Sequence, residues 1–182
     1  MAANSYCQFV SDKALDEVNR YYHDHEYGFP IADDNELFGR LILEINQAGL
    51  SWNTILNKQN NFRNAYDEFD IAKVAAYKTR QRNRLLNDAG IIRNRLKVDA
   101  AIHNANVILK LQKEFGSFGR WLDHHHPLTK DAWVKLFKKT FKFTGGEITG
   151  EFLMSTGYLP GAHAKDCPIY KKINAKNPAW KK

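Results

Sequence analysis

Apolar residues recur at helical spacing along most of this 182-residue chain, and this pattern constrains the fold more than any other feature. Such a stripe marks the buried face of an amphipathic helix. No segment shows the sustained alternation of apolar and polar residues that strands with one buried face require. We therefore predict an all-α fold. The central packing element should be a long helix over residues 94–114, whose stripe consists of Val98, Ala101, Ile102, Ala105, Ile108 and Leu109.

Capping and turn residues divide the rest of the chain into further helices. We expect these helices over residues 12–23, from Asp33-Asp34 to Gly49, after Ser51, over 61–66 and 71–77, from Thr79 to Gly90, and over 118–124, 131–140 and 147–156. No internal repeat, low-complexity tract or linker separates them, and a chain of this length can bury a continuous core. We expect a single-domain helical bundle over residues 1–182, with residues 170–182 as a mobile tail.

The composition indicates a globular protein, because 43% of the residues are hydrophobic and 26% are charged. No apolar run reaches the roughly 18 residues of a membrane span, and the first residues lack the basic and apolar regions of a signal peptide. We therefore expect a cytoplasmic monomer with no membrane partner. In a reducing cytoplasm the two cysteines, Cys7 and Cys167, are better suited to free thiols or metal ligation than to a disulfide.

Positive charge is concentrated in the second half of the chain. Residues 1–90 hold 10 Lys and Arg against 13 Asp and Glu, whereas residues 91–182 hold 17 against 7. A basic half suits a polyanion such as nucleic acid, because neutralised phosphates release counterions. Many basic proteins bind no nucleic acid, so this signal is weak without further motifs.

Glu44 is the most informative single residue. On a helix it lies between Leu41 and Ala48 and over Leu37, in the middle of an apolar stripe, so its carboxylate is aimed at the interior. From the stripe alone, a structural glutamate satisfied by helix-end amides or an arginine is at least as good an interpretation. The following Gln47-Ala48-Gly49-Leu50-Ser51-Trp52 brings an aromatic ring, a glycine turn and a leucine close to the carboxylate, and this context favours a pocket.

Cysteine and histidine residues suggest a metal site. His163 and Cys167 are four residues apart, so both can reach one ion from a helix turn or a tight loop, although this spacing alone is weak. If Cys7 and His23 join them, the set becomes a closed Cys2His2 site of the structural zinc type. The segment 124–126, His-His-His, competes with this set, but three adjacent residues cannot easily face one ion.

Residues 85–97 read as two helices joined by a tight turn at Gly90, with Arg93 and Arg95 opening the second helix. The amides of such a turn and the helix dipole can bind a DNA phosphate without reading sequence. The segment looks like a helix-hairpin-helix, although Ile92 stands where the commonest version has a second glycine. A plain packing corner between two helices is an equally good interpretation.

Together these segments resemble the type I 3-methyladenine-DNA glycosylase family from about Cys7 to Tyr170. The motifs that carry the resemblance are Cys7 with Phe9, Tyr22-His23-Asp24-x-Glu26-x-Gly28-x-Pro30, Leu43-Glu44-x-x-Gln47-Ala48-Gly49-Leu50-Ser51-Trp52, Asp88-Ala89-Gly90-Ile91-Ile92-Arg93, Phe141-Lys142-Phe143-x-Gly145 and His163-x3-Cys167. The resemblance implies a helix-hairpin-helix-superfamily fold, a structural Zn²⁺ that joins the chain ends, and extrusion of a damaged nucleotide into a pocket.

The resemblance also implies roles for individual residues. The zinc ligands would be Cys7, His23, His163 and Cys167. Glu44 would be the catalytic residue and would bond the edge of the base, while Tyr22, Trp52 and Phe9 would surround its ring. Gly49 and Leu50 would fill the gap left in the duplex, and the remaining DNA contacts would come from Gly90, Ile92, Arg93 and Arg95.

We therefore predict a monofunctional glycosylase of double-stranded DNA that removes 3-methyladenine, with 3-methylguanine as a second candidate base. No lysine occupies a motif that suggests Schiff-base chemistry. The main alternative is a catalytically weak or silent relative that binds alkylated or distorted DNA, and the presence of Glu44 and Trp52 argues against it. A zinc-dependent regulator with a helix-turn-helix is a third interpretation, which no recognition-helix pattern supports.

The chain departs from the usual family pattern at four places. Asn19 stands where a pocket tyrosine is usual, Phe9 and Tyr27 where tryptophans are usual, and Ile45-Asn46 where Gly-Gln is usual. Loss of an aromatic wall at Asn19 should weaken stacking, which contributes roughly 1–3 kcal/mol per base.

Overall fold

A computed structural model of the protein describes residues 5–12 and 17–182. Within these ranges it contains twelve α-helices, two short 3-10 helices and no strand, so the prediction of an all-α fold is confirmed. The helices are α1 (Tyr6–Asp12), α2 (Glu17–His25), α3 (Asp34–Gln47), α4 (Trp52–Leu56), α5 (Gln59–Ala65), η1 (Asp67–Phe69), α6 (Ile71–Ala75), α7 (Thr79–Asn87), α8 (Arg95–Phe115), α9 (Phe118–His125), α10 (Lys130–Thr140), α11 (Gly146–Ser155), α12 (Pro168–Ala175) and η2 (Ala179–Lys181). None of the described helices is both long and apolar enough to cross a membrane.

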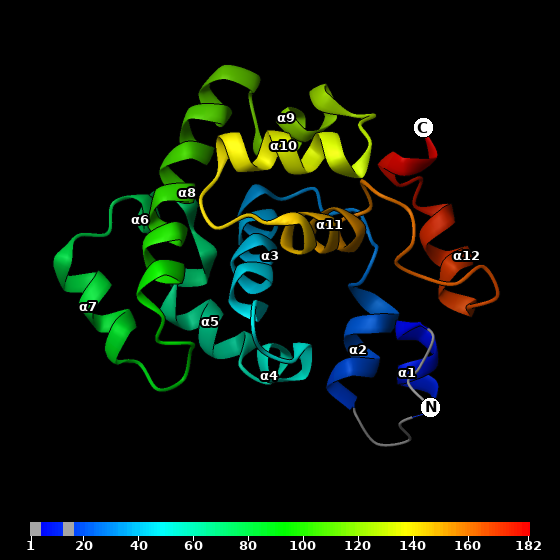
Figure 1. Ribbon diagram of the computed structural model, residues 1–182, viewed down its shortest axis with the longest axis horizontal. Coiled ribbons are helices and arrows are strands. Elements are labelled where there is room, and N and C mark those ends of the chain that lie inside the picture. Colours follow the sequence, from blue (N-terminus) through cyan, green and yellow to red (C-terminus); the bar gives the residue numbers. More distant parts are fainter. Residues whose placement is uncertain (1–4, 13–16) are drawn as a thin grey trace.

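Helix α3 occupies the centre of the molecule and packs against α4, α8, α9 and α11 (Figure 1). Ten consecutive residues of α3, 37–46, are buried. A helix that is apolar on more than one face is buried all round, and Phe38, Ile42 and Ile45 extend the apolar surface beyond the predicted stripe. The expected central element, α8, lies instead along one flank, where it covers α6 and α9. The prediction identified this long helix and its extensive packing correctly, whereas the most completely buried helix is α3.

Local capping residues set most helix boundaries. The side chains of Asp33, Ser51 and Asn94 accept hydrogen bonds from backbone amides in the first turns of α3, α4 and α8. Gly116 ends α8 with a φ of 91°, a conformation that glycine adopts without strain. Thr79, predicted as a cap, is the first residue of α7, and Lys78 occupies the cap position.

The N-terminal region differs from the expected single helix over residues 12–23. It contains two helices, α1 and α2, which pack against each other, and residues 13–16 lie outside the described part of the chain. The expectation failed because α1 is only seven residues long and shows no extended apolar periodicity.

The C-terminal segment lies on the same side of the molecule as α1 and α2 (Figure 1). We predicted a mobile tail over residues 170–182, and the structure gives this segment most of α12 and the short helix η2. Trp180 stacks on Tyr170 with 6.1 Å between ring centroids, and its backbone N–H donates to the Gly157 carbonyl over 3.2 Å. The segment therefore has specific contacts with the body of the protein.

Candidate active site and metal cluster

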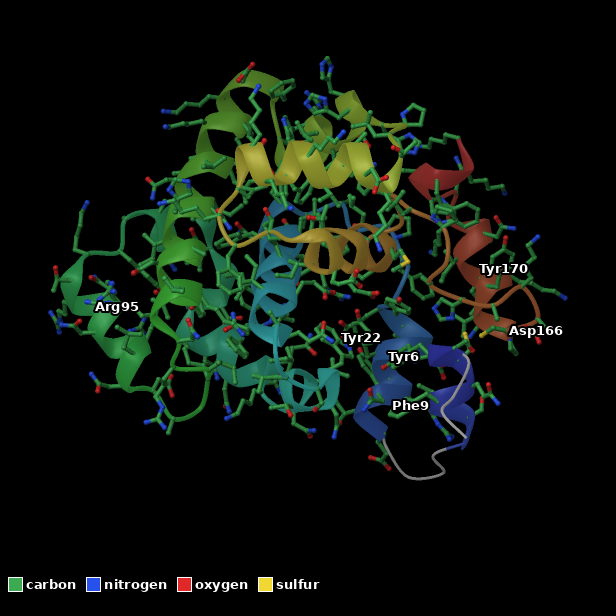
Figure 2. The ribbon with its side chains drawn as sticks, in the orientation of Figure 1. Tyr6, Phe9, Tyr22, Arg95, Asp166 and Tyr170 are labelled. Carbon is green, nitrogen blue, oxygen red and sulfur yellow. The ribbon has the colours of Figure 1, made fainter. Side chains whose placement is uncertain are left out.

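A cavity of about 390 Å³ lies among α1, α2, α3, α4 and α11. Four aromatic rings contribute to its walls, and Tyr22 packs against Trp52 and Tyr27 with centroid distances of 5.1 and 5.6 Å. Figure 2 shows Tyr6 and Tyr22 close together beside the centre of the molecule. The lining residues are Tyr6, Tyr22, Tyr27, Glu44, Gln47, Trp52, Glu151, Met154 and Gly161. Aromatic walls with a few polar groups suit a small planar ligand.

Glu44 lies on α3 at the wall of this cavity and is only 3% exposed. Burial raises the pKa of its carboxyl to about 8, although Arg40 lowers this pKa, and Glu151 raises it further. Arg40 is itself bonded elsewhere, since it donates to the Tyr22 hydroxyl over 2.5 Å and to Glu26 over 2.9 Å. The Glu44 carboxyl of the free protein is therefore mostly protonated at neutral pH, and a cation in the cavity would favour its ionised form.

Trp52 lines the cavity and carries a buried hydrogen-bond donor. Its indole Nε1 is buried and has no hydrogen-bond partner among the described residues. Buried indole N–H groups normally find an acceptor, because an unpaired one costs free energy. The Trp52 side chain lines the same cavity as Glu44, so a bound ring that carries an acceptor could satisfy this donor.

Tyr6 supplies an aromatic wall that sequence reasoning missed. Its hydroxyl donates to the Asn19 side-chain oxygen over 2.8 Å, and the Asn19 amide donates to the Asn53 side chain over 2.9 Å. Asn19 therefore anchors a tyrosine from α1, so the absence of an aromatic residue at position 19 leaves an aromatic wall in place. Phe9, predicted to bind the base, is not among the lining residues and stacks on Tyr6 with 6.0 Å between centroids.

Two further lining residues, Glu151 and Met154, also escaped the sequence analysis. Both lie on α11, more than 100 positions from Glu44, and only the packing of α11 against α3 brings them to the cavity. The one local signal was a carboxylate one turn from Ile148 on the expected helix. Such a signal does not separate a pocket residue from a solvated one.

The four predicted metal ligands come together next to this cavity. The ligand atoms of Cys7, His23, His163 and Cys167 all lie within 4.8 Å of one another. The Cys7 Sγ and Cys167 Sγ atoms are each 3.6 Å from His163 Nδ1, and Cys167 Sγ is 3.7 Å from His23 Nε2. Tetrahedral Zn²⁺ with Zn–S of about 2.3 Å and Zn–N of about 2.0–2.1 Å separates sulfur and nitrogen ligands by about 3.6 Å. The cluster therefore has the dimensions of a tetrahedral metal site.

Neighbouring groups orient both histidines of the cluster. His23 Nδ1 lies 2.6 Å from an Asp24 carboxylate oxygen, and His163 Nε2 lies 2.8 Å from the Tyr27 carbonyl oxygen. With hydrogens on these nitrogens, the other ring nitrogens face the cluster with lone pairs available, which is the usual support of metal-bound histidine. The competing His124, His125 and His126 do not form such a group within the described residues.

A groove of about 590 Å³ adjoins the cavity and carries the predicted wedge residues. Gly49 has a φ of 82°, and Leu50, at the turn after α3, is 41% exposed. The Lys97 ammonium donates to the carbonyls of Asn46 and Ala48 over 2.9 and 2.7 Å. This buried lysine from the first turn of α8 fixes the turn that presents Leu50.

Helices α7 and α8 are joined by a turn at Gly90, as the sequence predicted. Gly90 donates its amide hydrogen to the Asp88 side chain over 2.7 Å, and Ile92 packs against the main core. These two residues therefore shape the turn. Arg93 and Arg95 are exposed on it, and Figure 2 places Arg95 on the side of the molecule opposite Tyr170.

The fold and the site define a protein that is all-helical in its described residues, with a cavity that has aromatic walls and two carboxyl groups. The profile of the methyladenine glycosylase family matches residues 12–135. DNA-3-methyladenine glycosylase 1 from Escherichia coli K12 is 36% identical over an alignment of 183 positions, gaps included, that covers 90% of this chain and 96% of that protein. DNA-3-methyladenine glycosylase from Haemophilus influenzae Rd is 34% identical, covering 81% and 89%. The chain belongs to the methyladenine glycosylase family.

Solved structures agree with this assignment. The structure of 3-methyladenine DNA glycosylase I from Staphylococcus aureus that addresses 3-methyladenine recognition has a TM-score of 0.81 and 32% identity, covering 92% of this chain and 97% of that chain. A tyrosine-to-phenylalanine variant of 3-methyladenine DNA glycosylase I in complex with 3-methyladenine has a TM-score of 0.80 and 32% identity, covering 90% and 96%.

Proposed function

We propose that this protein is a monofunctional DNA glycosylase that hydrolyses the N-glycosidic bond of 3-methyladenine in alkylated double-stranded DNA, with 3-methylguanine as a second candidate base. The observation that carries the proposal is the buried carboxyl of Glu44 in an aromatic cavity. Family membership and the relatives named for this activity support it.

The reaction needs little acid catalysis. Methylation at N3 leaves adenine formally cationic, so the glycosidic bond is already weakened and the base departs as a neutral molecule. Selective binding of the cation can then supply much of the rate. The faces of Tyr22 and Trp52 offer cation–π attraction of about 0.5–2 kcal/mol each, which neutral adenine does not gain.

Glu44 adds a charge-dependent contribution to selectivity. In the free cavity its pKa of about 8 keeps the carboxyl mostly protonated at pH 7. A cationic base lowers this pKa by direct attraction, so binding of the lesion is coupled to release of a proton from Glu44. Neutral adenine provides no such attraction.

The target nucleotide must leave the duplex to reach this cavity. We assign Leu50 as the wedge that takes its place, because Leu50 is exposed at the groove beside the cavity. Arg93 and Arg95 are exposed at the α7–α8 turn and suit phosphate contacts that position the duplex without reading its sequence.

The cluster of Cys7, His23, His163 and Cys167 would hold one structural Zn²⁺. These four residues would supply all the ligands of a tetrahedral structural site, so the ion would not be available to a water or a substrate. When bound, the ion links α1 and α2 to the segment that leads into α12. We further propose that the protein acts as a monomer in the cytoplasm, in keeping with its two free cysteines.

The experiment is to incubate the protein with methylated duplex DNA and to identify the bases and DNA products. We expect release of 3-methyladenine and an intact strand that carries an abasic site. Tight binding of the methylated duplex without any released base would instead identify the silent relative considered above.

A further inference from the structure

Glu151 is a second carboxylate at the base cavity. It lies on α11, lines the same cavity as Glu44 of α3, and its Oε2 atom accepts a hydrogen bond from the Tyr27 hydroxyl over 3.2 Å. Burial raises the pKa of Glu151, and the two carboxyls are close enough that the charge of Glu151 raises the pKa of Glu44. The cavity therefore holds two acidic groups that repel each other when both are ionised.

Glu151 lies near the place where the glycosidic bond of a bound nucleotide would be. Glu44, Gln47 and Glu151 line both the aromatic cavity and the adjoining groove of Gly49 and Leu50. They therefore lie where the two spaces meet. A nucleotide whose base occupies the cavity and whose backbone follows the groove must pass its glycosidic bond between them.

The cations of the protein compensate these two carboxyls only in part. Arg40 lowers the pKa of Glu44, but its guanidinium already donates to Tyr22 and Glu26. Lys130 lowers the pKa of Glu151 to a smaller extent than burial raises it, and its ammonium lies 3.9 Å from the exposed Glu147. Two partly compensated carboxyls in a small cavity favour a positively charged occupant.

We propose that Glu151 is a second substrate-facing carboxylate, which stabilises the positive charge of the alkylated nucleotide at the junction of base and backbone. This inference rests on the proposed function and adds to it a residue outside the family motifs identified above. Glu44 and Glu151 then act from two different helices, α3 and α11, and their combined charge determines the preference for a cationic over a neutral base.

The test uses Glu151→Gln in the full-length protein. Glutamine keeps an acceptor for the Tyr27 hydroxyl and nearly the same volume, so it removes the charge alone. We expect single-turnover release of 3-methyladenine from duplex DNA to slow about tenfold. Binding to an uncleavable duplex that contains neutral 3-deaza-3-methyladenine should stay within about twofold of wild type.

Two variants make the result specific. Glu114→Gln removes an exposed carboxylate on α8 that lines neither the cavity nor the groove, and it should leave the rate unchanged. Tyr27→Phe removes the hydrogen bond to Glu151 but keeps its charge, so it should slow release less than Glu151→Gln does.

Each outcome has a separate meaning. If the wild type releases no 3-methyladenine, the proposed function fails. If the wild type is active and Glu151→Gln matches it, the inference about Glu151 is overturned. An equal loss of rate, of binding to the neutral duplex and of melting temperature would also overturn it, because Glu151 would then be a structural partner of Tyr27.

Discussion

The metal cluster and the cavity are neighbours that share helix α2, but they differ in how far their polar groups have hydrogen-bond partners. Tyr22 faces the cavity, and the next residue, His23, joins the cluster. In the cluster, each histidine nitrogen outside the ligand set has an oxygen partner within 2.8 Å. In the cavity, the carboxyl of Glu44 has a pKa raised by burial, and the Trp52 indole N–H has no partner in the described chain.

This difference separates a site built for stability from a site built for a ligand. A closed set of metal ligands whose polar groups all have partners lowers the free energy of the folded state. Buried polar groups without enough partners raise this free energy, and a bound ligand can supply the missing partners. Changes in the cluster should therefore reduce stability first, and changes in the cavity should reduce activity while sparing or improving stability.

The largest effect should come from Cys167→Ala, which removes a cluster ligand. Structural Zn²⁺ contributes about 10–16 kcal/mol to folding in zinc-finger peptides, so loss of even part of this contribution is several kcal/mol. In a domain of this size, 1 kcal/mol shifts Tm by about 2–4 °C, and we expect Tm to fall on the order of 10 °C. Metal analysis of the protein purified without added zinc should find one ion per chain in the wild type and far less in the variant.

The control for this prediction is His25→Ala. His25 lies on α2 two residues after His23, but it is exposed and outside the cluster, so its loss should change neither metal content nor Tm by much. If Cys167→Ala and wild type have the same Tm, or if the wild type contains no metal, the cluster does not stabilise the fold by binding zinc.

The second effect concerns the pH dependence of stability. The pKa of Glu44 is about 8 in the folded protein and near its ordinary value of 4.5 in the unfolded chain. As pH rises, the unfolded chain therefore releases the Glu44 proton at a lower pH than the folded protein does. The contribution of Glu44 to the free energy of unfolding is fully present below about pH 4.5 and is lost as pH rises towards 8. Denaturant unfolding should show Glu44→Gln gaining up to a few kcal/mol over wild type across this window.

Parallel pH curves for the two proteins would mean that the folded carboxyl keeps an ordinary pKa and is well paired. Glu44 would then be a fully paired group, like the histidines of the cluster.

The third effect is the activity of Glu44→Gln, which keeps the side-chain volume but removes the negative charge. Hydrogen bonds to charged groups contribute roughly 1.5–3 kcal/mol against about 1 kcal/mol for neutral ones. Single-turnover release of 3-methyladenine should therefore fall by about one order of magnitude or more, since about 1.4 kcal/mol corresponds to tenfold. Unchanged activity with a sharply lower Tm would show that Glu44 is a structural carboxylate.

The smallest effect should come from Leu50→Ala, which alters neither the cluster nor the cavity wall. Leu50 is exposed beside the groove, so its loss should cost little stability. We expect release of 3-methyladenine to slow several-fold on duplex DNA and less on single strands, where no base stack has to be opened. Equal slowing on both substrates would leave Leu50 as a packing residue only.

The sequence predicted the parts of the fold that depend on local signals. Asp33 and Asn94 cap helices wherever those helices lie in space, so the boundaries of α3 and α8 were predictable. The burial of α3 on all its faces was not predictable, because it depends on which faces the neighbouring helices cover. The short helix α1 was missed for lack of periodicity, and with it the place of Tyr6 in the cavity wall.

The candidate site was predictable to a similar degree. The cavity position of Glu44 followed from its helix face, and the metal ligands followed from the family resemblance, since their spacing alone was a weak signal. Phe9 was placed in the cavity because of the resemblance, and the structure puts Tyr6 there instead. Glu151 could not be predicted, because only the packing of α11 on α3 brings it to Glu44.

The cluster can form only late in synthesis, because its ligands come from both ends of the chain. Its contacts join Cys7 to His163 and His23 to Cys167, which are 156 and 144 positions apart. A chain leaving the ribosome therefore carries its first two ligands long before their partners exist. Helices α1 and α2, which supply the Tyr6 and Tyr22 walls of the cavity, therefore gain their contacts with His163 and Cys167 only after those residues have been made. A chain truncated before residue 163 lacks two of the four cluster ligands, so the cluster cannot link α1 and α2 to the segment that precedes α12.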